Sequence, residues 1–199
     1  MGIGAIVLAA GKSERMGRPK ALMPFRGRTF LEGILGAIAE SKIQYTVTVL
    51  GHNHAFIQAN VTLENVVVNP VYEKGMITSL QAGIQALPRE VEGALIFLVD
   101  HPVIQTRTIN ALIASFMAGR IVLPTFQGRR GHPVLFARSV LDEVMALPES
   151  SGANTVVRRD PGRIIEVALD DPGILIDVDT PADFEDLRQR SSSSSEQTS

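Results

Sequence analysis

Four cationic side chains follow the first apolar segment of the chain. Lys12, Arg15, Arg18 and Lys20 come shortly after the apolar run Ile3–Ala9. Lysine and arginine both bind phosphate oxygens, and the planar guanidinium of arginine can do so through two parallel hydrogen bonds. The spacing therefore suggests a site for a polyphosphate. The alternative is a solvated basic turn after an edge strand.

The residues between the apolar run and the cations are small. Ala9, Ala10 and Gly11 carry little or no side chain, so the backbone can approach a bulky planar or ribosyl group closely. Amides around Gly11–Ser13 could bind phosphate oxygens as a concave nest. A Walker A loop would need another glycine five positions before Gly11, and the chain has isoleucine there; the G-x-G-x-x-G pattern fails as well. We therefore predict a phosphate loop of another kind over Leu8–Lys20.

Carboxylates that could hold a metal ion occur at two distant places. Asp100 follows the apolar run Ala94–Val99, and Asp177 and Asp179 lie two apart just before Pro181. Mg²⁺ usually takes one or two carboxylates together with phosphate oxygens of the substrate. Asp100 and Asp179 are the expected metal ligands. The alternative for Asp179 is that it caps a helix beginning at Pro181, and Asp100 could likewise cap a loop.

The histidines give a weaker signal. No Ser–His–Asp or metalloprotease spacing is present. We expect His101 to be a wall of the pocket. His132 is either a substrate contact or a hydrogen-bonded structural histidine. His52 and His54 only weakly suggest a metal-binding pair.

Short apolar runs alternate along the chain with segments of helical periodicity. The elements that they form must position the groups described above. Several runs are continuously apolar, as expected for strands covered on both faces. The expected strands are Ile3–Ala9, Tyr45–Leu50, Asn65–Val68, Ala94–Val99, Ile121–Pro124, Pro133–Phe136, Ile164–Ala168 and Ile174–Asp177.

The intervening segments carry helix signals. Thr29–Glu32 has the spacing of a capping box, and Thr78–Gln81 is a second start signal. Further helices are expected over Thr106–Met117, Ser139–Leu147 and Pro181–Arg190. Alternation of strand and helix predicts an α/β domain with a mostly parallel sheet and right-handed crossovers. In such sheets ligands lie beyond the carboxyl ends of the strands.

Length and composition limit the remaining choices. We expect one domain over residues 1–190 and a disordered, serine-rich tail over residues 191–199. The net charge of −2 argues against a nucleic-acid partner, and the absence of cysteine rules out disulfides and thiolate chemistry. No stretch approaches the roughly 20 apolar residues of a membrane span, and no secretory signal is recognisable. The expected location is the cytoplasm.

The segment Leu8–Lys20 resembles the signature of the nucleotidyltransferases of the molybdenum cofactor family, the MobA-like NTP transferases, which read L-A-[AG]-G-x-S-x-R-M-G-x-x-K. The matching residues are Leu8, Ala9, Ala10, Gly11, Ser13, Arg15, Met16, Gly17 and Lys20. Four further segments match in the family's order: Gly75–Gly83, Leu98–Pro102, Gly131–Phe136 and Asp177–Asp183. The resemblance covers essentially residues 3–187. It implies a single three-layer domain with a mostly parallel, Rossmann-like sheet of the nucleotide-diphospho-sugar transferase type.

The same resemblance implies Mg²⁺-dependent nucleotidyl transfer, in which an acceptor phosphate attacks the α-phosphate of a nucleoside triphosphate and pyrophosphate leaves. Ala10 and Pro19–Leu22 side with the cytidylyl branch, so CTP and a molybdopterin-type acceptor are the expected substrates. A molybdoenzyme or its chaperone is a further expected partner. The segment Glu149–Asn154 departs from the family pattern G-D-x-G-A-R, so acceptor recognition can differ.

Site residues follow from the resemblance. The expected catalytic residues are Lys12, Arg15, Lys20 and Asp100. The expected nucleotide-binding residues are Leu8, Ala9, Ala10, Gly11, Lys12, Ser13, Lys20, Ser79 and Gly83. The expected substrate-binding residues are His132 and Pro133, and the expected Mg²⁺ ligands are Asp100 and Asp179. Two alternatives remain open: a transferase for another acceptor such as a sugar phosphate, and a non-catalytic chaperone that binds nucleotide or cofactor for a molybdoenzyme.

Overall fold

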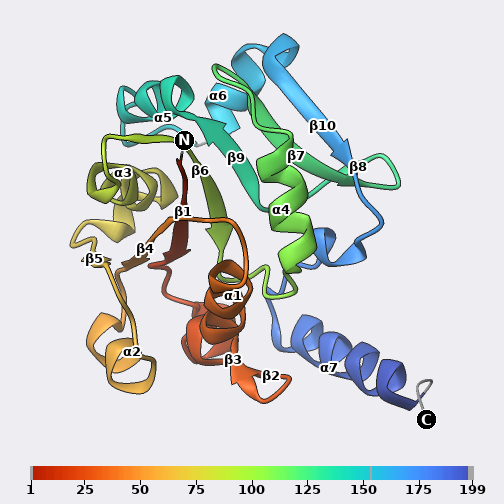
Figure 1. Ribbon diagram of the computed structural model, residues 1–199. Coiled ribbons are helices and arrows are strands. Elements are labelled where there is room, and N and C mark those ends of the chain that lie inside the picture. The colour runs from red at the N-terminus through yellow and green to blue at the C-terminus, as the bar shows by residue number, and fades with distance from the viewer. Residues whose placement is uncertain (1, 153, 197–199) are drawn as a thin grey trace.

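The computed structural model describes residues 2–152 and 154–196 (Figure 1). Its main sheet has eight strands in the order β10-β7-β9-β6-β1-β4-β5, with β8 paired to β7. These strands are β1 (Gly2–Ala9), β4 (Tyr45–Leu50), β5 (Val66–Val68), β6 (Val91–Leu98), β7 (Ile121–Phe126), β8 (Arg129–Arg130), β9 (Val134–Ala137) and β10 (Ile164–Ala168). A separate hairpin pairs β2 (Pro24–Phe25) with β3 (Arg28–Thr29).

Helices fill most of the connections between the strands. The α-helices are α1 (Phe30–Ala39), α2 (His54–Asn60), α3 (Met76–Ala86), α4 (Thr106–Ala114), α5 (Arg138–Met145), α6 (Asn154–Arg159) and α7 (Pro181–Glu196). Short 3₁₀ turns are η1 (Glu14–Met16), η2 (Lys20–Leu22), η3 (Tyr72–Lys74), η4 (Pro161–Arg163) and η5 (Pro172–Leu175). Within the described ranges, no helix has the length and apolar character that a bilayer crossing requires.

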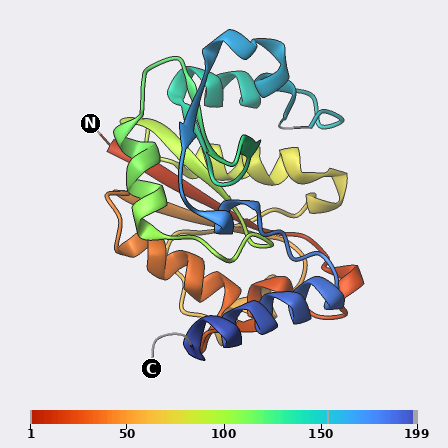
Figure 2. The same ribbon diagram turned by 90° about the vertical axis from the view of Figure 1, so that its right-hand side faces the viewer.

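The sheet is the middle of three layers (Figure 2). Every residue of β1 is buried, and its side chains alternate between two apolar clusters, one on each face. One cluster contains α3 and α5 through Ile77, Leu80, Ile84, Val140 and Val144. The other contains α1 and α4 through Leu31, Ile34, Ile38, Ile109 and Leu112. Each such side chain contributes about 1.5–3 kcal/mol on burial. The three-layer α/β fold is therefore confirmed.

The pairing of the central strands fixes where the functional loops emerge. β1 lies parallel to both β4 and β6, whereas β9 runs antiparallel to β6 and β7. Leu8 is opposite Leu98, and the amide of Val99 donates to the carbonyl of Leu8 at 3.1 Å. The loop after β1 and the segment after β6 consequently leave the same edge of the sheet.

The two predicted helix starts had different outcomes. The capping box at α1 is confirmed: Thr29 Oγ1 accepts from the amide of Glu32 at 3.2 Å, and Glu32 Oε2 accepts from the amide of Thr29 at 2.7 Å. The start at Thr78 is wrong, because α3 begins at Met76 after Gly75. Gly75 has a φ of 118°, a conformation open mainly to glycine. Thr78 instead donates its hydroxyl to the carbonyl of Gly75 at 2.9 Å.

The predicted strand Ile174–Asp177 is also wrong. The chain forms the 3₁₀ turn η5 there, because the side chain of Asp171 accepts from the amide of Gly173 at 2.9 Å and closes a tight turn around Pro172. The other expected strands are present. Helix α7 runs to Glu196 and so enters the serine-rich segment for which we expected disorder; a helix already nucleated extends at low cost. Gln197–Ser199 of that tail lie outside the described residues.

Candidate active site

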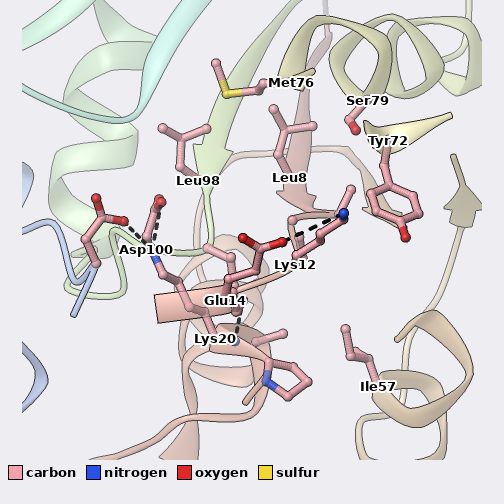
Figure 3. A pocket seen from close by; sticks show the side chains of 18 of the residues that line it. Leu8, Lys12, Glu14, Lys20, Ile57, Tyr72, Met76, Ser79, Leu98 and Asp100 are labelled. Carbon is pink, nitrogen blue, oxygen red and sulfur yellow. Dashed lines mark hydrogen bonds and ion pairs between the residues drawn. The ribbon is translucent and has the colours of Figure 1, made fainter. Parts of the chain in front are cut away.

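A cavity of about 600 Å³ opens at the carboxyl ends of β1 and β6 (Figure 3). Lys20 and Asp100 lie on one side of it, Tyr72 and Ser79 lie on the other, and Lys12 is between them. Most of the expected site residues line it: Leu8, Ala9, Ala10, Gly11, Lys12, Ser13, Arg15, Lys20, Ser79, Asp100 and Asp179. The residues that sequence reasoning placed in the loop after β1 thus share one cavity with acids from distant segments.

The loop after β1 folds back on itself. Ser13 has a φ of 55° and Gly17 a φ of 66°, so the chain turns at both ends of η1. The hydroxyl of Ser13 accepts a hydrogen bond from the amide of Lys20 at 3.1 Å. This bond closes the loop and sets the start of η2, which carries the side chain of Lys20 toward the cavity.

Lys20 joins the two expected metal ligands. Its Nζ lies 3.4 Å from Asp100 Oδ2 and forms a short ion pair with Asp179 Oδ1. Arg15 adds a second cation on Asp179, with Nη2 2.7 Å from Oδ2. Hydrogen bonding from Lys20, together with these positive charges, lowers the pKa of Asp179. The acids therefore lie together, on the same edge of the sheet as the cationic loop.

The backbone around Asp179 explains why its side chain is free for this role. The amide of Val178 donates to the carbonyl of Asp100 at 2.9 Å, which ties the two acidic segments together. Helix α7 is capped by Thr180, whose hydroxyl accepts from the amide of Asp183 at 3.3 Å, while Asp183 accepts from the amide of Thr180 at 2.7 Å. The side chain of Asp179 is thus outside the cap that we considered as its alternative role, while its amide donates to Asp183 at 3.0 Å.

A second ion pair lies at the other end of the cationic loop. Lys12 Nζ is 2.7 Å from Glu73 Oε1 and 3.8 Å from Glu14 Oε1. Glu73 belongs to η3, where Tyr72 Oη lies 3.0 Å from Nδ1 of His52. The hydrogen bond that Lys12 donates to Glu73 raises the pKa of Lys12, which stays protonated at neutral pH. Lys12 is therefore paired with a carboxylate that also lines the cavity.

A buried asparagine fixes the start of α3 at the cavity. Asn69 Nδ2 donates to Thr78 Oγ1 at 2.8 Å and to Ser79 Oγ at 2.9 Å. Ser79 lines the cavity, as expected. Gly83 does not belong to the described lining: a Cβ there would lie 2.5 Å from Cγ2 of Ile6, so its lack of a side chain lets α3 pack closely on β1.

His132 and Pro133, expected to bind substrate, likewise fall outside the described cavity lining. The ring of His132 lies 4.7 Å from that of His101, centroid to centroid. Burial, and to a smaller extent the neighbouring His101, lower the pKa of His132 to about 4, so His132 is neutral at pH 7. The amide of His132 donates to the carbonyl of Ile174 at 3.0 Å. His132 therefore lies against His101, the residue that follows Asp100.

Sequence reasoning missed several site residues. The missed residues Tyr72, Glu73, Met76 and Ile57 line the cavity. Tyr72 and Glu73 precede α3, Met76 is its first residue and Ile57 belongs to α2, and none of them is part of a phosphate-loop pattern. Met76 was the exception with a usable signal, since it lies within the matched segment Gly75–Gly83. The segment that departs from the family pattern, Glu149–Asn154, lies between α5 and α6. Within it Glu149 pairs with Lys74 at 2.9 Å, and Ala153 lies outside the described residues.

The parallel sheet, the cationic loop and the paired carboxylates define a nucleotidyltransferase domain. The chain belongs to the family of the MobA-like NTP transferase domain, which matches residues 5–164. It is 32% identical over 189 residues to a nicotine blue oxidoreductase of Paenarthrobacter nicotinovorans, with 89% of this chain and 92% of that protein covered. It is 28% identical over 193 residues to the molybdenum cofactor cytidylyltransferase of Escherichia coli K12, with 94% and 96% covered.

Solved structures share this fold. Rv0371c of Mycobacterium tuberculosis matches the fold with a TM-score of 0.86 at 29% identity, covering 94% of this chain and 97% of that one. A complex of Rv0371c with manganese matches with a TM-score of 0.81 at 27% identity, covering 94% and 98%. The structural similarity therefore extends over nearly the whole of both chains.

Proposed function

We propose that this protein transfers CMP from CTP to the phosphate group of a molybdopterin-type cofactor and releases pyrophosphate. The observation that carries the proposal is the meeting of Lys20, Asp100 and Asp179 at the edge of a cavity whose floor is the loop after β1. The name of the E. coli relative supports this choice of nucleotide and acceptor. Ala10 and Pro19–Leu22, which side with the cytidylyl branch, support it from the sequence.

The chain's own residues have positioning and electrostatic roles in this reaction. An oxygen of the acceptor phosphate forms a bond to the α-phosphorus of CTP, and the bond from that phosphorus to the bridging oxygen of pyrophosphate breaks. The acceptor phosphate is already ionised at neutral pH, so no general base is required. Lys12, Arg15 and Lys20 hold the triphosphate and the departing pyrophosphate. The fixed positive charge of Lys20 balances the negative charge that develops on the leaving group.

The carboxylate pair fits the Mg²⁺ ion that this chemistry calls for. Asp100 and Asp179 already face one cation, the ammonium of Lys20, and carboxylate oxygens are the ligands that Mg²⁺ takes beside phosphate. We assign both residues as its ligands. When bound, the ion supplies charge neutralisation at the phosphate oxygens. With that ion on the carboxylates, the ammonium of Lys20 would be available to the β- and γ-phosphates.

The oxidoreductase named among the relatives suggests a different activity. The loop after β1 offers cations where dinucleotide-binding dehydrogenases have the G-x-G-x-x-G pattern. The residues of the cavity therefore favour phosphate chemistry over hydride transfer. We propose the transferase activity for the cytoplasm, with a molybdoenzyme or its chaperone receiving the product.

The test is a matrix of substrates with pyrophosphate release as the readout. CTP, GTP, ATP and UTP are each assayed with Mg²⁺ against molybdopterin and against common sugar phosphates. We expect release with CTP and molybdopterin. Release with a sugar phosphate alone would assign another acceptor. Tight binding of CTP without release in any combination would favour a nucleotide-binding chaperone and contradict the proposal.

A further inference from the structure

A second group of potential metal ligands lies beside the carboxylate pair. Asp100, His101 and Asp177 each offer one ligand atom, and these atoms all lie within 4.8 Å of one another. Asp100 and His101 follow β6, whereas Asp177 lies between η5 and α7. The same two backbone segments are tied together by the bond from Val178 to Asp100 at 2.9 Å. The group is therefore held by backbone contacts and not by chance proximity of flexible side chains.

The two neighbouring carboxylates differ in how their charge is balanced. Asp179 pairs with Lys20 and Arg15. Asp177 has no ion pair with any cation among the described residues. Asp177 is exposed. Two carboxylates held this close repel each other, and an additional cation would balance their charge.

One nitrogen of His101, and one of the neighbouring His132, has no partner among the described residues. Nδ1 of His101 and Nδ1 of His132 are both buried and have no hydrogen-bond partner among the described residues. Buried polar side-chain atoms in proteins are nearly always bonded, so unpaired ones call for an explanation such as a bound ion or water. A neutral imidazole has a free lone pair on one nitrogen, and this is the form that ligates metals.

We propose that Asp100, His101 and Asp177 form a second cation position that takes a divalent first-row transition metal in preference to Mg²⁺. An imidazole nitrogen suits such metals, whereas Mg²⁺ favours oxygen ligands throughout. The inference deepens the proposed function, on which it rests for its role in catalysis, because Asp100 belongs to both positions. The binding itself is independent of any turnover.

The first experiment uses the unmodified protein and Mn²⁺ as the probe. Pulsed electron paramagnetic resonance of bound Mn²⁺ detects nitrogen nuclei in its coordination shell. We expect ¹⁴N coupling from one imidazole, lost in His101→Met and in Asp177→Asn but kept in Asp179→Asn. Absence of ¹⁴N coupling in the unmodified protein would overturn the proposal. Coupling that survives in His101→Met would do the same, because the nitrogen would then come from another residue.

The second experiment measures affinity with matched controls. Mn²⁺ is titrated by its free-ion resonance signal, and Mg²⁺ by competition. His101→Met should weaken Mn²⁺ binding about tenfold or more, as loss of a ligand should exceed the tenfold or greater effect of losing its supporting partner. Mg²⁺ binding should change less than about threefold. His54→Met and Asp142→Asn, at exposed positions on α2 and α5, should leave both affinities unchanged. Equal weakening of both ions in His101→Met would contradict the proposed preference.

The two proposals can fail separately. Mn²⁺ binding with ¹⁴N coupling but no pyrophosphate release would leave the metal position standing and remove the proposed reaction. Pyrophosphate release with Mg²⁺ in a protein that shows no ¹⁴N coupling would keep the reaction and remove the second cation position. Thermal unfolding of each variant, followed by circular dichroism, identifies a variant that has lost its fold; the result on the unmodified protein stands regardless.

Discussion

The two ends of the cationic loop make the same kind of ion pair in different surroundings. At one end Lys12 faces Glu73, with side chains 40% and 63% exposed. At the other end Lys20 faces Asp100 and Asp179, and the side chain of Lys20 is only 10% exposed. Exposed pairs are screened by water and contribute little to stability, whereas a pair with a buried member is strongly sensitive to loss of one partner.

The difference in burial indicates that the two ends of the loop have different roles. Lys12 can exchange Glu73 for a phosphate at small cost, so its end of the loop is suited to admit and release a ligand. Lys20 is fixed by burial, by the Ser13 hydrogen bond to its amide and by two carboxylates, so its end is suited to hold reacting groups in place. Preorganised charge of this kind is the main electrostatic device of enzymes that act on phosphates.

The largest expected effect comes from Asp100→Asn, at the fixed end. The amide has nearly the same shape but cannot balance a cation, so kcat should fall about 10²- to 10³-fold. The fold should be retained because the side chain of Asp100 is partly exposed. Steady-state pyrophosphate release and the thermal midpoint measure the two effects. Unchanged turnover would remove Asp100 from the mechanism.

Lys20→Met tests whether the buried ion pairs of Lys20 stabilise the fold as well as contribute to catalysis. The variant keeps the apolar stem and leaves Asp100 and Asp179 facing each other without an ammonium between them. We expect kcat to fall about 10- to 100-fold. We also expect the free energy of unfolding to fall by about 1–2 kcal/mol, a value reduced because both acids are partly exposed. Urea denaturation gives the second quantity. A loss of activity at full stability would show that the cluster is not a structural element.

The fixed end of the loop, formed by Lys20 with Asp100 and Asp179, could be predicted from the sequence only in part. The cation loop was predictable because its residues are contiguous and its small residues and cations have a local meaning. The expected contact of Asp100 with Asp179 came from the family resemblance, since residues 79 apart carry no local signal of proximity. The strand predicted at Ile174–Asp177 would have placed Asp177 and Asp179 on one face. The turn η5 replaces it, and the two acids now meet different partners.

The contacts at the Lys12 end of the loop, which we call the labile end, could not be predicted from the sequence. Tyr72 and Glu73 belong to a short 3₁₀ turn, which leaves no periodic pattern, and their contact with Lys12 depends on how η3 packs before α3. Gly83 was misinterpreted for a related reason. A glycine within a matched motif can allow close approach of a ligand or close packing of a helix. The 2.5 Å that would separate a Cβ at position 83 from Cγ2 of Ile6 assigns Gly83 to helix packing.

The histidines behind the fixed end provide a pH-dependent test of its burial. The pKa of His132 is lowered from 6.5 to about 4 by burial and then by His101. Since the unfolded chain binds this proton at a higher pH than the folded chain, the stability from a neutral His132 is complete above about pH 6.5. It is lost as pH falls toward 4, by up to about 3 kcal/mol.

The His132→Gln variant should remove this component of the pH dependence. Urea denaturation between pH 7 and pH 4 compares the unmodified protein with His132→Gln, and His54→Gln, at an exposed position, is the control. Stability of the unmodified protein and of the control should fall more steeply with acid than that of His132→Gln. Parallel curves for all three would mean that His132 is hydrated in solution.

The smallest effects are expected at the labile end, from Lys12→Met and Glu73→Gln. Both side chains are well exposed, so neither variant should shift the thermal midpoint measurably. Lys12→Met should raise KM for CTP about three- to tenfold with kcat little changed, because it removes a contact present in both ground and transition states. Glu73→Gln should leave KM equal or lower, since it removes the carboxylate that competes with phosphate for Lys12. An increase of KM in Glu73→Gln would contradict the exchange of Glu73 for phosphate at Lys12. Glu73 would then be holding Lys12 in its binding position.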